Sequence, residues 1–410
     1  MSPNIVGIDI GSSSVRALEL RNADKARPVV ERFHEVPLPE GSVRRGEVLE
    51  IGTVSTAIKR LWSTGGFKTR DVVLGMGGPR VLSRDLQMPA VPLEQIREAL
   101  PFHVQDMLPV PVAEAILDFY PISQETGEHG PVINGLLVAA IKEAVSANVA
   151  AVTRAGLRPV QVDLIPFALA RLFTQRRSGG GLTALVSIGA NTTNVVISQD
   201  GVPQFVRIIS SGGDDITRAV AGRLQLAPQQ AEAAKRDIGL GSANIRPDQR
   251  PAMEVIYEGA RELLTAIRNT LNYYVNSKPG TVLNRIVLSG GGSQLSGLGR
   301  ALSEAVGVNV VQADTFSGAQ LSNSARSRAS QEQQDAMATL YGFPLDSLNW
   351  PHRNSHRLDL IDLTPVRSSD LDTPDRPRAR GHRVNGKVLP VENRHFNHWN
   401  TDPWQLDYGG

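Results

Sequence analysis

Two short stretches of this chain share one pattern, in which an apolar strand runs into a glycine and a cluster of small polar side chains. They read Ile8-Asp9-Ile10-Gly11-Ser12-Ser13-Ser14 and Val186-Ser187-Ile188-Gly189-Ala190-Asn191-Thr192-Thr193. Glycine lets the backbone approach an anion closely, and successive N–H groups together with hydroxyls form a donor site for phosphate. The repeat therefore predicts two half-domains that close on one nucleotide.

The two stretches differ two residues before the glycine, where the first has Asp9 and the second has Ser187. A serine hydroxyl carries no charge, and it takes no proton near pH 7 without an activating base. It can still hydrogen-bond a metal-bound water. We therefore expect nucleotide binding with slow or absent hydrolysis.

A third glycine cluster, Ser289-Gly290-Gly291-Gly292-Ser293, follows an apolar strand and precedes a helix. Such a backbone can lie flat against a base or a ribose, and a helix N-terminus attracts an anion. The sequence has no Walker A string, and Arg80 stands where a dinucleotide fingerprint would place a third glycine after Gly75 and Gly77. Three clusters that each follow a strand favour one shared nucleotide site over three independent turns.

The composition narrows the class of protein. The chain has 410 residues, which is too many for one ordinary core, so two or more lobes are expected. Lys and Arg total 43 against 41 Asp and Glu, so the net charge of +2 gives no footprint for nucleic acid. The absence of cysteine excludes disulfides and thiol catalysis, and no run approaches the roughly 18–20 apolar residues of a membrane span. We expect a cytoplasmic protein with no nucleic-acid partner and no direct membrane span.

Apolar alternation predicts short strands around both turns, and apolar residues at helical spacing predict helices between them. Within residues 81–143 we expect a helix over 93–107 and two strands, around 117–121 and 134–141, joined by a polar loop at 125–130. Beyond residue 313 the patterning decays, and residues 346–410 are rich in Pro, His, Asn and Arg without apolar periodicity. We expect this C-terminal tail to be poorly structured.

These signals divide the chain into lobes. The expected parts are a first-lobe core (1–80 and 144–178), an inserted subdomain (81–143), a second-lobe core (181–225 and 278–345), a helical subdomain (226–277) and the tail (346–410). The glycine run at 178–181 is the expected boundary between the lobes.

Several segments match one family. The first is residues 7–20, which contain the first turn. The others are Met88-Pro89-Ala90-Val91, Leu108-Pro109-Val110-Pro111, Ala155-Gly156-Leu157-Arg158-Pro159, Phe167-Ala168-Leu169-Ala170, and the glycine-containing segments 188–190, 211–214 and 288–292. On these residues the chain resembles the actin superfamily and, within it, the PilM family of actin-like type IV pilus assembly proteins, relatives of the division protein FtsA. The resemblance implies an α/β fold of the actin-like (ribonuclease H-like), two-lobed ATPase type with an inserted subdomain.

The resemblance also implies ATP and Mg²⁺ as ligands. In the first turn Asp9, Gly11, Ser12 and Ser13 would hold the phosphates, with Asp9 facing Mg²⁺ through water. The remaining implied residues are Gly189, Asn191 and Thr192 in the second turn, Gly212, Gly213 and Asp214 at the phosphate end, Glu232 and Lys235 at the ribose, and Gly291 and Gly292 at the adenine. Two alternatives stay open: Asp214 could cap a helix N-terminus, and Glu232 with Lys235 could belong to a solvated helix face.

The implied role is that of an assembly scaffold with weak ATPase activity at most. It would bind the short cytoplasmic N-terminal peptide of a PilN-like inner-membrane protein, contact other pilus assembly proteins, associate with itself, and stay peripheral to the inner membrane through its partners. One alternative is an active ATPase or phosphotransferase of the sugar-kinase kind, which needs a catalytic carboxylate that Ser187 does not supply. Another is a filament-forming division protein like FtsA.

Overall fold

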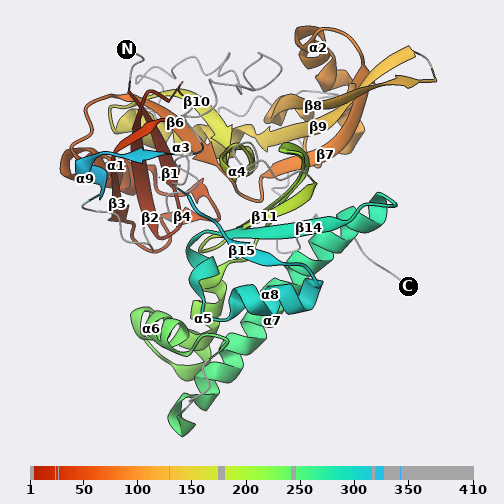
Figure 1. Ribbon diagram of the computed structural model, residues 1–410. Coiled ribbons are helices and arrows are strands. Elements are labelled where there is room, and N and C mark those ends of the chain that lie inside the picture. The colour runs from red at the N-terminus through yellow and green to blue at the C-terminus, as the bar shows by residue number, and fades with distance from the viewer. Residues whose placement is uncertain are drawn as a thin grey trace, which may run out of the picture.

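The computed structural model shows two lobes, each built on a mixed β-sheet, with helices extending from the second lobe (Figure 1). It describes residues 4–23, 25, 27–128, 130–173, 181–241, 246–315, 319–326 and 342. The expected tail at 346–410 and residues 178–180 of the expected lobe boundary lie outside the described residues. Among the helices of the described ranges, none combines the length and apolar character needed to cross a membrane.

The described strands of the first-lobe sheet run in the order β10-β6-β1-β2-β3-β16. Their bounds are β1 (Ile5–Ile10), β2 (Ser14–Arg21), β3 (Val29–Pro37), β6 (Asp71–Met76), β10 (Arg158–Leu164) and β16 (Gln320–Leu321). Helices α1 (Ile51–Gly65) and α3 (Lys142–Arg154) pack against each other, and a small hairpin of β4 (Val43–Arg44) and β5 (Glu47–Val48) contacts α3. Helix α1 buries Val54, Ile58 and Leu61 at helical spacing and ends where Gly66 adopts a φ of 70°.

The inserted subdomain carries a three-stranded sheet in the order β7-β9-β8 within the described residues. Its elements are β7 (Val81–Pro89), α2 (Leu93–His103), the 3-10 turns η1 (Gln105–Met107) and η2 (Val112–Glu114), β8 (Ala115–Gly127) and β9 (Gly130–Ile141). The prediction of a polar loop over residues 125–130 is wrong, because strands β8 and β9 remain paired as far as Gly127 and Gly130. Backbone pairing extends this hairpin past its last buried side chains, so the apolar pattern ends before the strands do.

The helix expected over residues 93–107 is also shorter than the sequence indicates. Helix α2 ends at His103, two residues after Pro101, and residues 105–107 form a separate 3-10 turn. Proline has no N–H for the intrahelical ladder and its ring crowds the preceding turn. Apolar spacing alone runs through this break because the buried side chains continue on both sides of it.

The second lobe has a five-stranded sheet among the described residues, in the order β13-β12-β11-β14-β15. The strands are β11 (Leu182–Ile188), β12 (Thr193–Gln199), β13 (Val202–Ile209), β14 (Leu283–Ser289) and β15 (Val310–Gln312), and the helices are α5 (Gly213–Leu224), α6 (Pro228–Ile238), α7 (Arg250–Ser277) and α8 (Leu298–Val306). Strands β12 and β13 are joined by Asp200 and Gly201, both with positive φ, as in a two-residue hairpin turn.

One face of the second-lobe sheet packs against the first lobe. Leu185, Val196 and Val287 belong to the same buried apolar cluster as the first-lobe core, and α4 (Ile165–Phe173) contacts β11, β12 and β13. Side chains alternate along a strand, so Ser187 shares a sheet face with Leu185. The polar residue that replaces the aspartate in the second turn therefore lies on the face directed at the first lobe.

The C-terminal part of the described chain returns to the first lobe. We expected residues 278–345 to belong to the second lobe, but β16 pairs with β3, and α9 (Asn323–Arg326) also contacts β3. The hydroxyls of Ser322 and Ser324 donate to the carbonyl oxygen of Glu31, at 2.7 and 2.8 Å. A strand of two residues gives no periodic signal, so only tertiary pairing places it.

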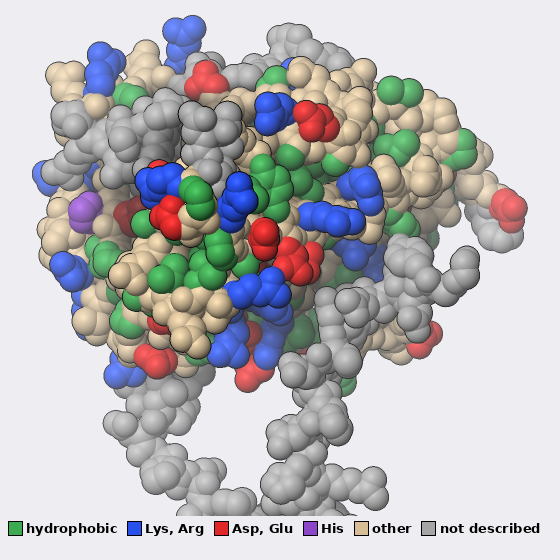
Figure 2. Space-filling view, turned by 90° about the horizontal axis from the view of Figure 1, so that it is seen from below, with side chains coloured by type: hydrophobic (Ala, Val, Ile, Leu, Met, Phe, Trp, Pro, Cys, Tyr) green, Lys and Arg blue, Asp and Glu red, His purple; other side chains and the backbone are tan. Residues whose placement is uncertain are grey.

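The surface does not concentrate one sign of charge on the face seen from below the lobes. Figure 2 shows Asp and Glu side chains interspersed with Lys and Arg side chains on that face. This mixture fits the small net charge of +2.

Candidate nucleotide site

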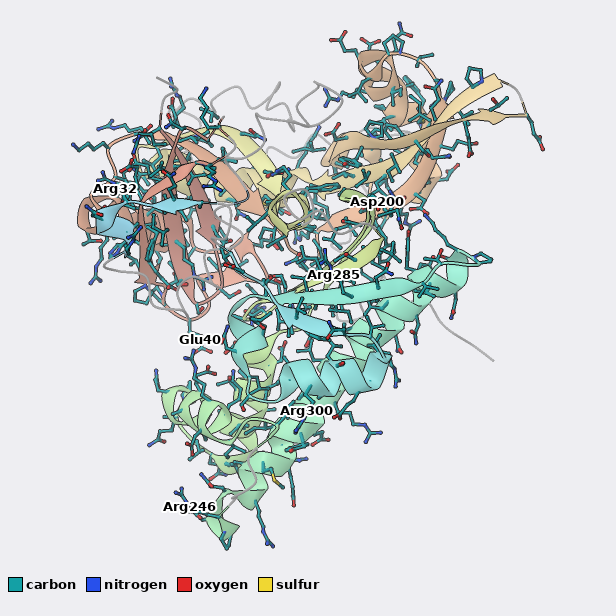
Figure 3. All side chains as sticks on the ribbon, in the orientation of Figure 1. Arg32, Glu40, Asp200, Arg246, Arg285 and Arg300 are labelled. Atoms are coloured by element: carbon teal, nitrogen blue, oxygen red, sulfur yellow. The ribbon has the colours of Figure 1, made fainter. Side chains whose placement is uncertain are left out.

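The first turn is a tight backbone loop between β1 and β2. The N–H of Gly11 donates to the carbonyl oxygen of Ser14 at 3.0 Å, and the N–H of Leu38 donates to the carbonyl oxygen of Ser13 at 2.9 Å. Ser13 is exposed and Ser12 half-buried, so the turn does not bury its residues in the core. Glu40, just beyond Leu38, lies at the edge of the first lobe on the side of the second lobe (Figure 3), and the first turn is bonded to this same segment.

Three ionisable side chains form a row across the strands that flank the first turn. Asp9 lies opposite Arg16, and Arg16 lies opposite Glu35, so all three share one face of the sheet. The Nε of Arg16 donates to Glu35 Oε1 at 3.0 Å and to Ser14 Oγ at 3.2 Å, whereas its Nη1 lies 3.9 Å from Asp9 Oδ2. Arg16 is thus hydrogen-bonded to Glu35 and only electrostatically paired with Asp9.

The pKa values of the two carboxyl groups in this row are shifted in opposite directions. Burial raises the pKa of Asp9, the nearby Arg16 opposes this shift, and the charge of Glu35 adds to it. Burial alone would also raise the pKa of Glu35, but the charge of Arg16 and hydrogen bonds from Ser14 and Arg16 outweigh it, so that pKa is lowered. The surrounding groups therefore stabilise the ionised form of Glu35 and disfavour that of Asp9.

The second turn repeats the backbone geometry of the first. The N–H of Gly189 donates to the carbonyl oxygen of Thr192 at 2.9 Å, and a Cβ placed on Gly189 or on Gly11 would lie 3.1 Å from the corresponding carbonyl oxygen. The side chain of Thr193 donates to the carbonyl oxygen of Ser211 at 2.8 Å, which ties the turn to the segment before α5.

The start of α5 is bonded to the second turn. The N–H groups of Gly213 and Asp214 donate to the carbonyl oxygens of Gly189 and Ala190, at 2.9 and 2.8 Å, and Asn191 Nδ2 donates to Asp214 Oδ2 at 3.0 Å. These two N–H groups are therefore bonded within the second lobe and hold the turn in place. The capping carboxylate is Asp215, which accepts the Gly212 N–H at 2.8 Å.

The second lobe has its own cross-strand row beside the turn, and that row is uncharged. Ser187 lies opposite Asn194 on β12 and beside Ser289 on β14. All three are buried, and neither Asn194 Oδ1 nor Ser289 Oγ has a hydrogen-bond partner among the described residues. Buried polar atoms without partners are costly, so this row is suited to hold water or a polar ligand.

The third glycine cluster packs directly on the second turn. Gly290 has a φ of 84°, and a Cβ on Gly290 or Gly292 would collide with Ile188. A Cβ on Gly213 would lie 3.5 Å from the Cα of Gly292, whereas one on Gly291 would meet nothing within 4 Å. The structure therefore gathers the expected glycines of the second lobe into one cradle, with Gly291 open to a ligand.

The side chains of Glu232 and Lys235 link α6 to α5. The buried ammonium of Lys235 donates to the Gly213 carbonyl oxygen at 2.9 Å and to Thr217 Oγ1 at 2.8 Å, and it lies 2.6 Å from Glu232 Oε2. Burial alone would raise the pKa of Glu232, but hydrogen bonds from Arg236, Lys235 and Thr217 lower it. The Lys235 ammonium already has three acceptors, and its closest link to the cradle is the carbonyl of Gly213.

No sequence motif assigns a separate role to the side chains of Arg16, Glu35, Asn194 or Ser289. Their signal lies in strand register: once Gly11 and Gly189 close their turns, the residue opposite Asp9 must be Arg16, and the residue opposite Ser187 must be Asn194. Turn length fixes this pairing in any hairpin. Within the described residues no cluster of three or more His, Asp or Glu side chains could hold a metal ion.

A family model described as type IV pilus assembly protein PilM matches residues 7–348. The chain belongs to this PilM family. A solved structure titled as the PilM-PilN type IV pilus biogenesis complex is 27% identical, with a TM-score of 0.70 over 83% of this chain and 97% of that chain. The prediction of an actin-like α/β fold in the PilM family is therefore confirmed.

The chain is also similar to the cell division protein FtsA. It is 26% identical to FtsA of Pseudomonas aeruginosa over 72% of this chain and 78% of that protein. It is 20% identical to FtsA of Bacillus subtilis over 57% of this chain and 58% of that protein, so it spans just over half the length of that relative. The FtsA relatives are distant, and the filament-forming alternative is not favoured by them.

Proposed function

We propose that this PilM-family protein is an assembly scaffold that binds ATP with Mg²⁺ between its two lobes and hydrolyses it slowly or not at all. The observation that carries the proposal is the pair of turns: their backbone geometry is the same, but only the first has a carboxylate. Asp9 stands in the first turn, and the second has an uncharged row of Ser187, Asn194 and Ser289.

The residues of both lobes fit a nucleotide. The glycines of the second-lobe cradle pack so closely that side chains at Gly290 or Gly292 would collide with Ile188, while Gly291 faces open space where a flat base could lie. In the first lobe, Gly11, Ser12 and Ser13 would offer donors to the phosphates, and Arg16 would supply positive charge. Asn191 and Thr192 would complete the site from the second turn.

A single carboxylate fits a magnesium ion that arrives with the nucleotide. Magnesium keeps several waters and commonly takes one or two carboxylates together with substrate phosphates. Asp9 would face the ion through water, and the buried oxygens of Asn194 and Ser289 could accept hydrogen bonds from that water. Bound magnesium would neutralise phosphate charge at the turn.

Slow hydrolysis follows from the chemistry of the second row. Attack on the terminal phosphate is fast when a base removes a proton from the attacking water, and none of Ser187, Asn194 and Ser289 takes a proton near neutral pH. The bound nucleotide would then stabilise the closed arrangement of the lobes rather than be turned over. Such a protein acts by presenting a surface to partners.

The proposed partner is the short cytoplasmic N-terminal peptide of a PilN-like inner-membrane protein. Support comes from the match to a PilM-PilN complex at 27% identity. Peptide binding would keep the protein at the inner membrane through its partner. Contacts with other pilus assembly proteins, and self-association through residues 81–143, belong to the same proposal.

Nucleotide binding and turnover can be separated with three variants. We would measure binding of a fluorescent ATP analogue and phosphate release for the wild type, Asp9→Ala and Ser187→Asp, with Ser187→Asn as an uncharged control of the same size. The expected result is tight wild-type binding, weaker binding in Asp9→Ala, and release that rises only in Ser187→Asp. Brisk wild-type release would overturn the slow-hydrolysis claim, and absence of wild-type binding would leave a scaffold without a nucleotide.

Partner binding has its own test. A synthetic peptide with the cytoplasmic N-terminal sequence of the PilN-like protein from the same organism should bind the full chain, and a scrambled peptide should not. The measurement is fluorescence anisotropy with and without ATP and Mg²⁺. Repeating it on a chain that ends at residue 345 shows whether the C-terminal tail takes part.

A further inference from the structure

Beside the first turn, the carboxylate of Glu35 is bonded to Arg16, the cation of the row. Glu35 on β3 accepts a hydrogen bond from Arg16 Nε at 3.0 Å, and its side chain is 36% exposed, more than that of Asp9 or Arg16. Glu35 therefore lies at the outer end of the row, with Arg16 between it and Asp9. Glu35 is not among the residues expected to bind the nucleotide.

The charges of this row do not balance. Two carboxylates flank one guanidinium, so with both ionised the row carries a net charge of −1 at the place where phosphates would bind. The second row cannot offset it, because Ser187, Asn194 and Ser289 are uncharged. A polyphosphate approaching the first turn meets a cation that is already hydrogen-bonded to a carboxylate.

We propose that Glu35 is a positioning residue that holds Arg16 while the site is empty and is displaced from it by phosphate, so that Glu35 limits the affinity for ATP. This inference rests on the proposed nucleotide function and adds a residue that tunes it. Glu35 acts through Arg16 rather than by touching the nucleotide. An anion and a carboxylate compete for the same guanidinium because both form charge-assisted hydrogen bonds with it.

The same two strands contain a matched ion pair far from the turn. Arg21 Nε donates to Glu31, which links β2 to β3 at the opposite end of these strands. A Glu31→Gln variant therefore makes the same chemical change in the same pair of strands without touching the row at the turn. It controls for general effects of removing one negative charge from the lobe.

The test measures binding of a fluorescent ATP analogue with Mg²⁺, with inorganic tripolyphosphate as competitor. Glu35→Gln is expected to bind about fivefold to tenfold more tightly than the wild type, because the charge-assisted hydrogen bond that holds Arg16 away from phosphate is weakened. Glu31→Gln should stay within about twofold of the wild type, because Glu31 bonds Arg21 at the opposite end of these strands and not Arg16. A Glu35→Gln variant that binds no more tightly than Glu31→Gln would overturn the inference.

A double-variant cycle shows whether Glu35 acts through Arg16. In an Arg16→Gln background the gain from Glu35→Gln should vanish, whereas a gain of the same size would overturn the proposed route. The two proposals also fail differently. If the wild type binds but Glu35→Gln gains nothing, only this inference falls. If the wild type binds no nucleotide but Glu35→Gln does, the inference about Glu35 holds and the proposal that the wild type binds ATP fails. If neither binds, both fall.

Discussion

The two turns of this protein have the same backbone and opposite chemistry. Each closes with one N–H bond across three residues, at 3.0 Å for Gly11 and 2.9 Å for Gly189. The row beside the first turn is Asp9, Arg16 and Glu35. At the three corresponding strand positions beside the second turn stand Ser187, Asn194 and Ile208, all uncharged. The difference teaches that the strands beside the first turn present charged side chains, whereas those beside the second present uncharged ones and rely on close-packed backbone.

The support behind each turn differs in the same way. The first turn is attached to its lobe through one backbone bond from Leu38 and through the ion pairs of Arg16. The second is bonded to the start of α5 and covered by the glycine cluster after β14. Substitutions should therefore act on binding in the first lobe and on folding in the second.

The largest expected effect comes from breaking the backbone packing of the second turn. Gly290→Ala places a Cβ against the Ile188 carbonyl at a φ of 84°, and we expect the free energy of unfolding to fall by about 2–4 kcal/mol. Urea denaturation measures it. Gly291→Ala is the matched control, since its Cβ meets nothing within 4 Å, and it should change stability by less than about 0.5 kcal/mol. Equal losses in both variants would contradict this account of the second turn.

The second-largest effect is expected from a substitution in the charged row beside the first turn. Arg16→Met should weaken Mg-ATP binding about thirtyfold, the size of a lost hydrogen bond to a charged group. Asn194→Ala, at the corresponding position of the second lobe, should cost about threefold or less. Isothermal titration calorimetry measures both, after thermal melting shows that the variants fold. A greater loss in Asn194→Ala would reverse the comparison between the turns.

A third prediction sharpens the comparison at Lys235, whose ammonium is bonded within the second lobe. Lys235→Met should lower the free energy of unfolding by about 1–2 kcal/mol, because Glu232 and the Gly213 carbonyl lose a donor. ATP affinity should change less than about threefold. The exposed Lys59→Met serves as the control for removing a charge. A variant that keeps its stability and loses ATP binding would instead place Lys235 at the ribose.

The smallest expected effect is a pH dependence at Glu232. The pKa of Glu232 is lower in the folded chain than its ordinary value of 4.5, so its ionised form stabilises the fold above pH 4.5. This stabilisation is lost as pH falls through the lowered folded pKa. Glu232→Gln should melt about 2–4 °C below the wild type at pH 7, and the gap should narrow below pH 4.5. The exposed Glu254→Gln should show no such gap, and a Glu232→Gln gap that widens at low pH would contradict the sign.

Much of the fold was predictable because its signals are local. The strands on both sides of each turn, the helix end at Gly66 and the helix Leu298–Val306 follow from apolar spacing and glycine positions. The elements that sequence reasoning misplaced lack such a signal. The outer half of the β8–β9 hairpin is stabilised by backbone pairing, and β16 has only two residues.

In the candidate site, too, residues with a local sequence signal could be predicted and residues placed by packing could not. The glycines of the second lobe could be found from sequence because each follows an apolar strand, and the structure brings Gly189, Gly213 and Gly292 together. The roles of Lys235 and Arg16 could not be found in this way. A charged side chain on a helix or strand has several acceptors within reach, and spacing along the chain does not say which one it takes.

The sequence by itself determined the repeated strand and turn, the aspartate in one copy and the serine in the other, and the family to which they point. These are properties of a few consecutive residues, so no folding is needed to see them. Only the tertiary structure decided that Arg16 bonds Glu35, that Lys235 is bonded inside the second lobe, and that residues 320–326 return to the first lobe. Each of these depends on strand register or on packing between residues far apart in the chain, where the choice of partner is made by geometry rather than by pattern.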